Sequence, residues 1–187
     1  MRAALVAVAL VAACGAPARP VEPAKATVDV KAEVDLAEAA ERTRQHDVAR
    51  AHFQKAVAAA RDPSSIAYAR WRFAETLVSW GELPEARAQL EAAVQARPDH
   101  PIAWHDLGHV RFGSDDYPGA IAAFQKARDL APRELKPRLS LAVTLWKHGD
   151  LAAASNEYRA LLELDLPDRT RGKVEWAIAE LAKLQKR

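Results

Sequence analysis

The stretch WHDLGHVRFGSDDYPGAIAAFQKARDLAP, from Trp104 to Pro132, decides the fold of this 187-residue chain. It contains a large–small pair, an acidic turn and a second apolar segment that ends at a proline. The same arrangement recurs about 34 residues earlier and later, which is the length of a helix–turn–helix repeat. With units that start at Ala67, Pro101 and Leu135, the seventh and eighth residues form the pairs Phe73 with Ala74, Leu107 with Gly108, and Leu141 with Ala142.

Each unit continues with a turn and a second apolar helix. The turns contain residues suited to turns or helix caps, namely Gly81-Glu82, Asp115-Asp116 and Gly149-Asp150. The second helices carry apolar residues at spacings i, i+4 and i+7, which define one helical face. These residues are Ala86, Leu90 and Ala93; Ala120, Phe124 and Ala127; and Ala154, Tyr158 and Leu161. The units end at Pro98, Pro132 and Pro167.

The three units resemble the tetratricopeptide repeat family, whose pattern is Trp, Leu-Gly, an aromatic residue, Ala, an aromatic residue, Ala and Pro. The middle unit matches this pattern almost everywhere, with Arg111 at an aromatic position, whereas Arg70 and Arg138 replace Trp in the outer units. The abundance of Ala also favours helices. The resemblance implies an all-α, tetratricopeptide-type solenoid of helix–turn–helix repeats at residues 67–100, 101–134 and 135–168.

A weaker helical pattern precedes these units. Residues 30–66 predict a degenerate repeat, as expected for a terminal repeat that has a neighbour on one side only. Two registers remain open for it. Matching Pro63 to the later prolines starts the repeat at Ala32, whereas matching the small and aromatic residues Ala49, Phe53 and Ala56 starts it at Val30.

A further helix is predicted after the last clear unit. Residues 169–187 contain apolar residues on one face and Lys173, Glu180, Lys183 and Lys186 on the other. Solenoids need such a helix because the last repeat would otherwise expose its apolar edge. We therefore predict a C-terminal capping helix, with Trp176 and Ala177 as its large–small pair.

The N-terminus has the features of an export signal. A positively charged start and the apolar run from Ala3 to Ala13 predict a signal peptide over residues 1–13, because a run of this length is too short to span a bilayer. The run ends in Val11-Ala12-Ala13-Cys14, which resembles a bacterial lipobox. This resemblance implies cleavage before Cys14 and lipidation of Cys14. An ordinary cleaved signal followed by an incidental cysteine is the alternative.

Residues 14–29 then contain the lipidated cysteine and a tether with Pro17, Pro20 and Pro23. Proline-rich segments favour an extended conformation of about 3.1 Å per residue, so that this tether reaches about 45 Å. The resemblance to lipoproteins implies a lipid-anchored protein of the bacterial cell envelope. Because Gly15 and not Asp follows the cysteine, an outer-membrane location facing the periplasm is favoured over the inner membrane.

The family resemblance also implies where a partner would bind. Stacked tetratricopeptide repeats form a concave groove lined by their first helices, whose second, fifth, ninth and twelfth residues commonly point inward. Apolar and aromatic residues in such a groove favour binding of a protein or peptide. The residues are Tyr68, Trp71, Glu75 and Val78; Ile102, His105, His109 and Phe112; and Lys136, Leu139, Val143 and Trp146. The alternative is that a short array packs some of them against its own terminal helices.

Other classes of function find little support in the sequence. The 27 Lys and Arg residues are interspersed with 25 Asp and Glu residues, so the chain lacks the basic stripe of a nucleic-acid-binding protein. There is neither a Gly-rich phosphate loop nor a Gly-x-Ser-x-Gly motif, and the single cysteine is assigned to lipid. We therefore predict no catalytic residue and no cofactor.

One motif deserves comparison with metal sites. His105 and His109 share a helical face, and with Asp106 they imitate the H-E-x-x-H arrangement of zinc proteases. A catalytic zinc ion needs a third protein ligand, which the sequence does not supply, and the two residues between the histidines belong to the repeat pattern. The sequence thus predicts no metal site. A metal-dependent periplasmic hydrolase that uses this pair remains the alternative function.

Taken together, the sequence predicts a non-enzymatic, membrane-tethered lipoprotein that acts as a scaffold for a protein or peptide partner. Analogy with repeat-containing lipoproteins suggests a role in envelope assembly, in the outer-membrane, secretin or pilus, or peptidoglycan machinery. A self-assembling structural protein, whose terminal helices stack end to end, is a third possibility.

Overall fold

The structure, a computed structural model, describes residues 28–186. Within this range the chain forms nine α-helices and no strand, as predicted for an all-α fold. The helices are α1 (Val30–Arg42), α2 (His46–Ala59), α3 (Pro63–Ser79), α4 (Leu83–Ala96), α5 (Pro101–Gly113), α6 (Tyr117–Leu130), α7 (Leu135–His148), α8 (Leu151–Leu162) and α9 (Asp168–Leu184).

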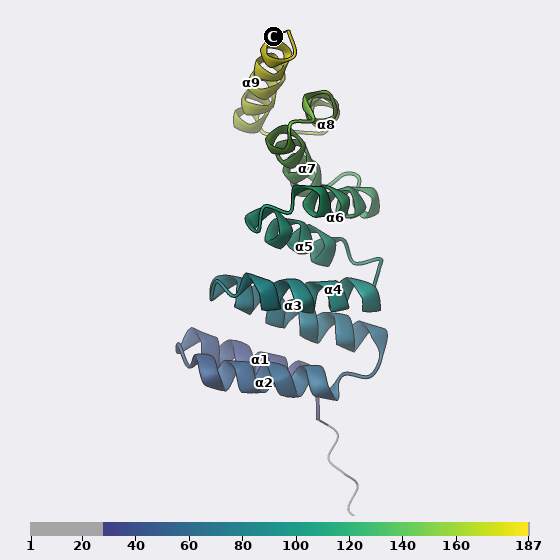
Figure 1. The fold of residues 1–187 in the computed structure, drawn as a ribbon. Helices are drawn as coiled ribbons and strands as arrows, with labels where there is room; N and C mark the ends of the chain where they lie inside the picture. The colour runs from purple at the N-terminus through teal and green to yellow at the C-terminus, as the bar shows by residue number, and fades with distance from the viewer. Residues whose placement is uncertain (1–27, 187) are drawn as a thin grey trace, which may run out of the picture.

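The helices stack as pairs into an elongated solenoid. The pairs α1/α2, α3/α4, α5/α6 and α7/α8 follow one another, and α9 packs against α8. Figure 1 shows α1 and α2 at one end of the molecule and α9 at the other. Each described pair therefore contacts mainly its neighbours along the stack, as in other repeat proteins.

The turn within each of the four pairs contains one residue in the left-handed conformation. These residues are Arg44, Gly81, Asp115 and Gly149, with φ angles of 57°, 79°, 58° and 97°. The last three are each the fifteenth residue of a predicted repeat. Arg44 is the fifteenth residue counted from Val30, which favours the Val30 register of the first repeat over the register that starts at Ala32.

The second pair begins earlier than the repeat pattern predicts. Helix α3 starts at Pro63 and not at Ala67, so it has an additional turn at its N-terminus. Asp62 caps this turn, because its Oδ1 atom accepts hydrogen bonds from the backbone N–H groups of Ser64 and Ser65, both at 3.0 Å. Proline suits the first helical turn, where its missing N–H group would have no intrahelical partner.

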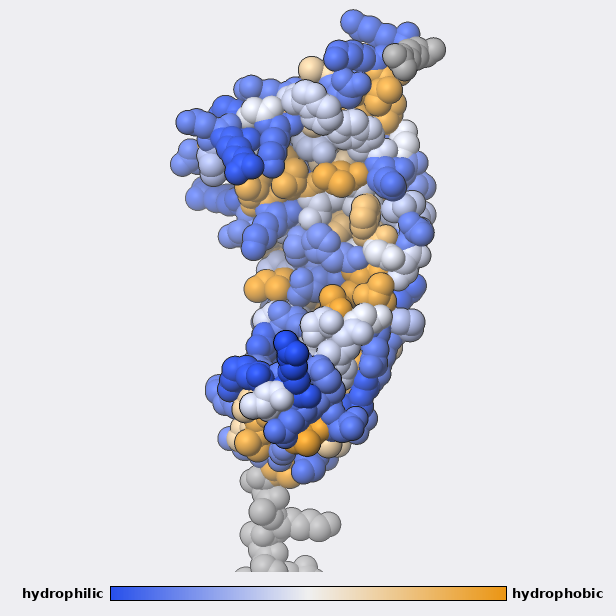
Figure 2. All heavy atoms as spheres, turned by 90° about the vertical axis from the view of Figure 1, so that its left-hand side faces the viewer, coloured by the Kyte–Doolittle hydropathy of each residue, from blue (hydrophilic) through white to orange (hydrophobic). Residues whose placement is uncertain are grey.

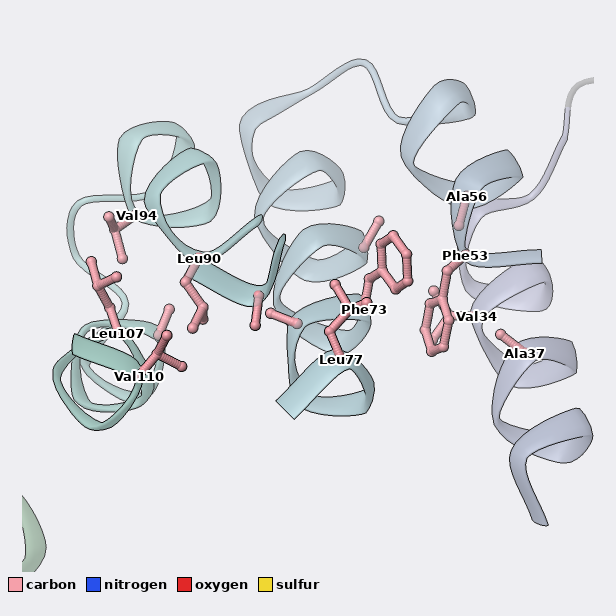
Figure 3. Close-up of a cluster of buried hydrophobic side chains, with 14 of the residues drawn as sticks. Val34, Ala37, Phe53, Ala56, Phe73, Leu77, Leu90, Val94, Leu107 and Val110 are labelled. Atoms are coloured by element: carbon pink, nitrogen blue, oxygen red, sulfur yellow. The ribbon is translucent and has the colours of Figure 1, made fainter. Parts of the chain in front are cut away.

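The large–small pairs set the spacing between the helices. Gly108 lies against the ring of Phe124, and a Cβ atom at Gly108 would come within 2.5 Å of the Phe124 Cε1 atom. The interior along α1 to α5 is formed by alanines and by larger residues, which Figure 3 shows, and the rings of Phe53 and Phe73 stack there at 5.1 Å. The repeat pattern therefore corresponds to close contacts between helices.

The departures from the family pattern are compensated locally. At the two positions where Arg replaces Trp, Arg70 donates a hydrogen bond of 2.9 Å to Gln89, and Arg138 donates one of 2.8 Å to Glu157. Both bonds connect the first helix of a pair to its second helix. Arg111, at an aromatic position, pairs with Glu91 at 2.9 Å. Polar contacts thus replace aromatic packing at these positions.

The capping helix is present, but its register differs from the predicted one. Helix α9 buries Val174, Ala177 and Leu181, which lie on one helical face, against α8. Trp176 is 63% exposed and is not the large member of a buried pair. The prediction was wrong because Val174, Ala177 and Leu181 form the buried face of α9, and Trp176 lies off this face.

The opposite end of the stack has no cap among the described residues. Leu36 occupies the large position of the first repeat, yet it is 49% exposed, and Val28 and Val48 at the same end of the stack are also exposed. In the later repeats, each of which follows another helix pair, the residues at this position are buried, namely Phe73, Leu107 and Leu141. None of the described helices has the length and apolar content needed to cross a membrane. The predicted signal peptide and Cys14 lie outside the described residues.

Candidate binding groove

The predicted groove residues lie at the surface of α3, α5 and α7, and none of the twelve is buried. Six are exposed and six are half-buried. The exposed residues are Glu75, Val78, Ile102, His109, Lys136 and Val143, and the half-buried residues are Tyr68, Trp71, His105, Phe112, Leu139 and Trp146. Figure 2 views the molecule from the side on which α5 and α9 lie in Figure 1 and shows apolar patches between hydrophilic side chains.

Side chains on α3 are held by partners within the chain. The indole N–H group of Trp71 donates a hydrogen bond of 2.8 Å to the Asp106 carboxylate, and Arg72 pairs with Glu38 and Glu75. Partial burial raises the pKa of the Glu75 carboxyl group, although the Arg72 guanidinium acts in the opposite direction. We call Glu38, Trp71, Arg72, Glu75 and Asp106 the paired region.

The sequence analysis did not single out Glu38 or Arg72 and noted Asp106 only as part of the histidine motif. Arg72 and Asp106 are the sixth residues of their repeats, next to the fifth position that was predicted to face the groove. The 35-residue separation of Trp71 and Asp106 could have indicated this contact, because it joins the fifth position of one repeat to the sixth position of the next. The paired region therefore stabilises the stacking of α3 on its neighbours.

The two histidines meet in the middle of the groove. The Nε2 atoms of His105 and His109 are 3.2 Å apart, and the Ser140 hydroxyl on α7 lies 3.2 Å from one and 3.3 Å from the other. Partial burial lowers the pKa of His109, and the charge of His105 lowers it further. Across residues 28–186 no three His, Cys, Asp or Glu side chains converge in a way that could hold a metal ion.

Two adjoining pockets form the floor of the groove along α5, α7 and α9. One, of about 240 Å³, is lined by residues that include Phe112, Leu139 and Val143. The other, of about 250 Å³, is lined by Leu139 together with Trp146 and Trp176. Because Leu139 lines both pockets, these five side chains form a continuous surface, which we call the apolar strip.

Sequence reasoning missed Trp176 in this strip. Its ring lies 6.1 Å from the ring of Trp146, and Lys173 borders the same pocket. Trp176 is the ninth residue of α9 counted from Asp168, and the ninth residue is one of the groove positions. Helix α9 begins directly after Pro167, one residue earlier than the repeat period predicts, and this start could have indicated the groove position of Trp176.

A third pocket, of about 520 Å³, lies at the edge of the groove between α5 and α7. Ile102, His105 and Lys136 line it, so the second-position residues of these two helices border one shared depression. Tyr68 packs against the interior cluster of the N-terminal half, as Phe112, Leu139 and Trp146 pack against that of the C-terminal half. A fourth pocket, of about 360 Å³, lies between α3 and α5 and is lined by residues that include Glu75, Val78 and His109. Pockets therefore follow the groove from α3 to α9.

Two family models, both described as tetratricopeptide repeats, match the chain over residues 72–134 and 111–174. Together the matches run from residue 72 to residue 174, which is more than half of the chain. The chain therefore belongs to the tetratricopeptide repeat family.

The relatives found by sequence and by structure agree with this assignment. The peroxisomal targeting signal receptor of Komagataella phaffii is 34% identical over 90 residues, which is 48% of this chain but 16% of the receptor. The structure of YrrB, described as a TPR protein with an unusual peptide-binding site, has a TM-score of 0.70 at 20% identity and covers 84% of this chain and 78% of YrrB.

The first TPR domain of Spaghetti (RPAP3), bound to the HSP90 peptide SRMEEVD, has a TM-score of 0.57 at 15% identity. The match covers 65% of this chain and 94% of that domain. At these identities the structural similarity shows the fold, and the two structures are of tetratricopeptide repeats that bind peptides. The chain spans about a sixth of the curated receptor, so that protein's activity as a whole does not transfer to it.

Proposed function

We propose that this chain is a membrane-tethered lipoprotein whose groove binds a segment of a protein partner through the apolar strip. The observation that carries this proposal is the exposure of large apolar side chains along a continuous part of the groove. Val143 is 43% exposed and Trp176 is 63% exposed, although both lie beside a well-packed interior. Exposed apolar surface of this kind marks interaction sites, and aromatic residues often dominate their binding energy.

The rigidity of the scaffold favours binding. The pockets are lined by side chains on α5, α7 and α9, whose helices are fixed by a common interior cluster that contains Leu141, Leu161 and Val174. A preformed site loses little conformational entropy when its ligand binds. YrrB and the Spaghetti domain, which share the fold, are described with a peptide-binding site and with a bound peptide.

The proposed tether fits the position of the groove. Lipidation at Cys14 would attach the chain to the membrane before α1, which is at one end of the stack (Figure 1). The apolar strip lies on α5, α7 and α9, toward the other end. The partner would therefore bind away from the membrane surface. We place the protein in the outer membrane, facing the periplasm, and in an assembly process of the cell envelope.

The groove proposal is tested by photo-crosslinking in cells. A crosslinking amino acid at Val143, in the strip, should capture a defined protein, whereas one at Gln125, exposed on the second helix α6, should not. Identical products from both positions, or no product from either, would contradict the proposed groove.

The tether is tested separately by fractionation. Replacing Cys14 with Ala should release the full chain from membranes, since the acyl chains supply the attachment. Persistent membrane association of the Cys14→Ala variant would contradict lipid anchoring without affecting the groove proposal.

A further inference from the structure

Three polar atoms from two repeats meet in the groove at nearly equal distances. His105 Nε2 and His109 Nε2 on α5 are 3.2 Å apart. The Ser140 Oγ atom on α7 lies 3.2 Å from the first and 3.3 Å from the second. The three atoms therefore form an almost equilateral triangle, of which only the two histidines were noticeable in the sequence.

Hydrogen bonding alone accounts poorly for this triangle. A ring nitrogen of histidine either carries a hydrogen and donates or has a lone pair and accepts. The Ser140 hydroxyl supplies one hydrogen, and pairing the two Nε2 atoms requires that just one of them carries another. Only the hydroxyl hydrogen and one imidazole hydrogen are then available for the three contacts. At least one hydrogen must therefore be shared between two acceptors.

The dimensions of the triangle match the coordination of a small metal ion. Zinc binds histidine nitrogen at about 2.0–2.1 Å, usually in a tetrahedron, and two ligands of such a tetrahedron are about 3.3 Å apart. The three observed separations lie within about 0.2 Å of this value. A single cation above the plane of the three atoms, about 2.0–2.1 Å from each, would contact all of them at once.

Neighbouring side chains pack against both imidazoles. The Phe124 ring packs against both, with centroid distances of 5.5 Å to His105 and 5.0 Å to His109. The Asp106 carboxylate lies 3.6 Å from the Nδ1 atom of His105. A carboxylate on that side favours the proton on Nδ1 and leaves the Nε2 lone pair available, as in metal-bound histidines.

We propose that His105, His109 and Ser140 form a binding site for a divalent transition-metal ion such as zinc, with at least one coordination position open to the groove. This goes beyond the sequence-based expectation of no metal, because the third ligand comes from the neighbouring repeat. Two imidazoles and one hydroxyl make a modest ligand set, since strong sites use histidine, cysteine or carboxylate throughout. The affinity is therefore expected in the micromolar range.

An ion at this position would be accessible to a bound partner. His105 lines the pocket of about 520 Å³, and His109 lines both the pocket of about 240 Å³ and another of about 360 Å³. The site thus lies where three depressions of the groove meet. A carboxylate or imidazole of a partner would be suited to the open coordination position.

The test is calorimetric titration of the full chain with zinc chloride, which needs no knowledge of the partner. We expect one zinc ion per chain with micromolar affinity, and tighter binding of copper(II), which such ligands prefer. His105→Ala and His109→Ala should each weaken zinc binding at least about tenfold, and Ser140→Ala by a smaller but measurable factor. His148→Ala, which changes an exposed histidine of α7, is the matched control and should leave the affinity unchanged.

Circular dichroism of each variant separates loss of the site from loss of the fold. Absence of zinc binding by the folded parent chain would overturn the proposal. So would zinc binding that His105→Ala and His109→Ala leave intact, or that His148→Ala weakens equally. Zinc binding unaffected by Ser140→Ala would overturn the three-ligand site. None of these outcomes depends on whether the apolar strip binds a partner.

Discussion

The groove surfaces of α3 and α7 use the same repeat positions for different purposes. On α3 the fifth residue, Trp71, donates a hydrogen bond to Asp106, and the adjoining Arg72 is paired with two carboxylates. On α7 the fifth and twelfth residues, Leu139 and Trp146, line open pockets. A repeat position therefore predicts which way a side chain faces, whereas its neighbours in the next repeat decide whether it stabilises the stack or remains available to a partner.

The largest effect is expected from removing the aromatic residue that packs against the two groove histidines. Phe124 is fully buried against Gly108 and contacts both groove histidines. Phe124→Ala should reduce the free energy of unfolding by about 3–5 kcal/mol, because it leaves a cavity in a packed interior. Urea denaturation measures this. A loss of less than about 1 kcal/mol would mean that the helices can close the gap, contrary to the packing described.

Removing an exposed member of the apolar strip should affect binding and leave stability unchanged. Trp176→Ala should weaken binding of the crosslinked partner at least tenfold, or about 1.4 kcal/mol, since exposed tryptophans often carry much of the binding energy. Its urea midpoint should match that of the parent chain, because the side chain is mostly exposed. Partner binding is measured by fluorescence titration. Unchanged affinity, or a large fall in stability, would place Trp176 in a structural role.

The paired region should respond in the opposite way. Trp71→Phe keeps an aromatic ring and removes the indole N–H group that bonds to Asp106. We expect it to cost about 1 kcal/mol of stability, the usual contribution of such a hydrogen bond, and to leave partner affinity unchanged. Urea denaturation and the same fluorescence titration test this pair of outcomes. Weaker binding without loss of stability would show that α3 also contacts the partner.

The smallest effect is electrostatic and also concerns the paired region. Partial burial raises the pKa of Glu75 above the ordinary value of 4.5, while Arg72 opposes the shift. The folded state then binds more protons than the unfolded state above that value, so the contribution of Glu75 to stability falls as the pH rises through its raised pKa. NMR titration of the carboxyl group should give a midpoint above 4.5, and Arg72→Gln should raise it further. A midpoint below 4.5 would contradict the upward shift of the Glu75 pKa.

Much of the fold could be predicted because the residues of the repeat pattern lie where neighbouring helices contact each other. Gly108 predicts a close approach, and Phe124 is the residue that approaches it. The twelve groove positions follow from the same period. Contacts between repeats were not predicted, because they join the fifth or ninth residue of one repeat to the sixth residue of the next, and the sixth residue is not a groove position. Asp106 beside Trp71 and Ser140 beside the histidines are of this kind.

The buried face of α9 was predicted wrongly for a different reason. Helix α9 begins at Asp168, one residue before the start that the repeat period predicts, whereas the prediction paired Trp176 with Ala177. Burial of Val174 fixes the helix in another rotation. At the end of a solenoid only one side constrains a helix, so a one-residue change in length alters which residues reach the groove.

Two valines allow the most direct test of where the partner binds. Val78 on α3 and Val143 on α7 are 42% and 43% exposed. They are the twelfth and the ninth residue of their repeats, and both of these positions face the predicted groove. Replacing each by Asp introduces the same charge at the same exposure, next to the paired region in one case and within the apolar strip in the other. We predict that Val143→Asp abolishes capture of the crosslinked partner and that Val78→Asp leaves capture unchanged, as measured by pull-down from cells. Equal loss in both variants, or loss only in Val78→Asp, would contradict binding through the apolar strip.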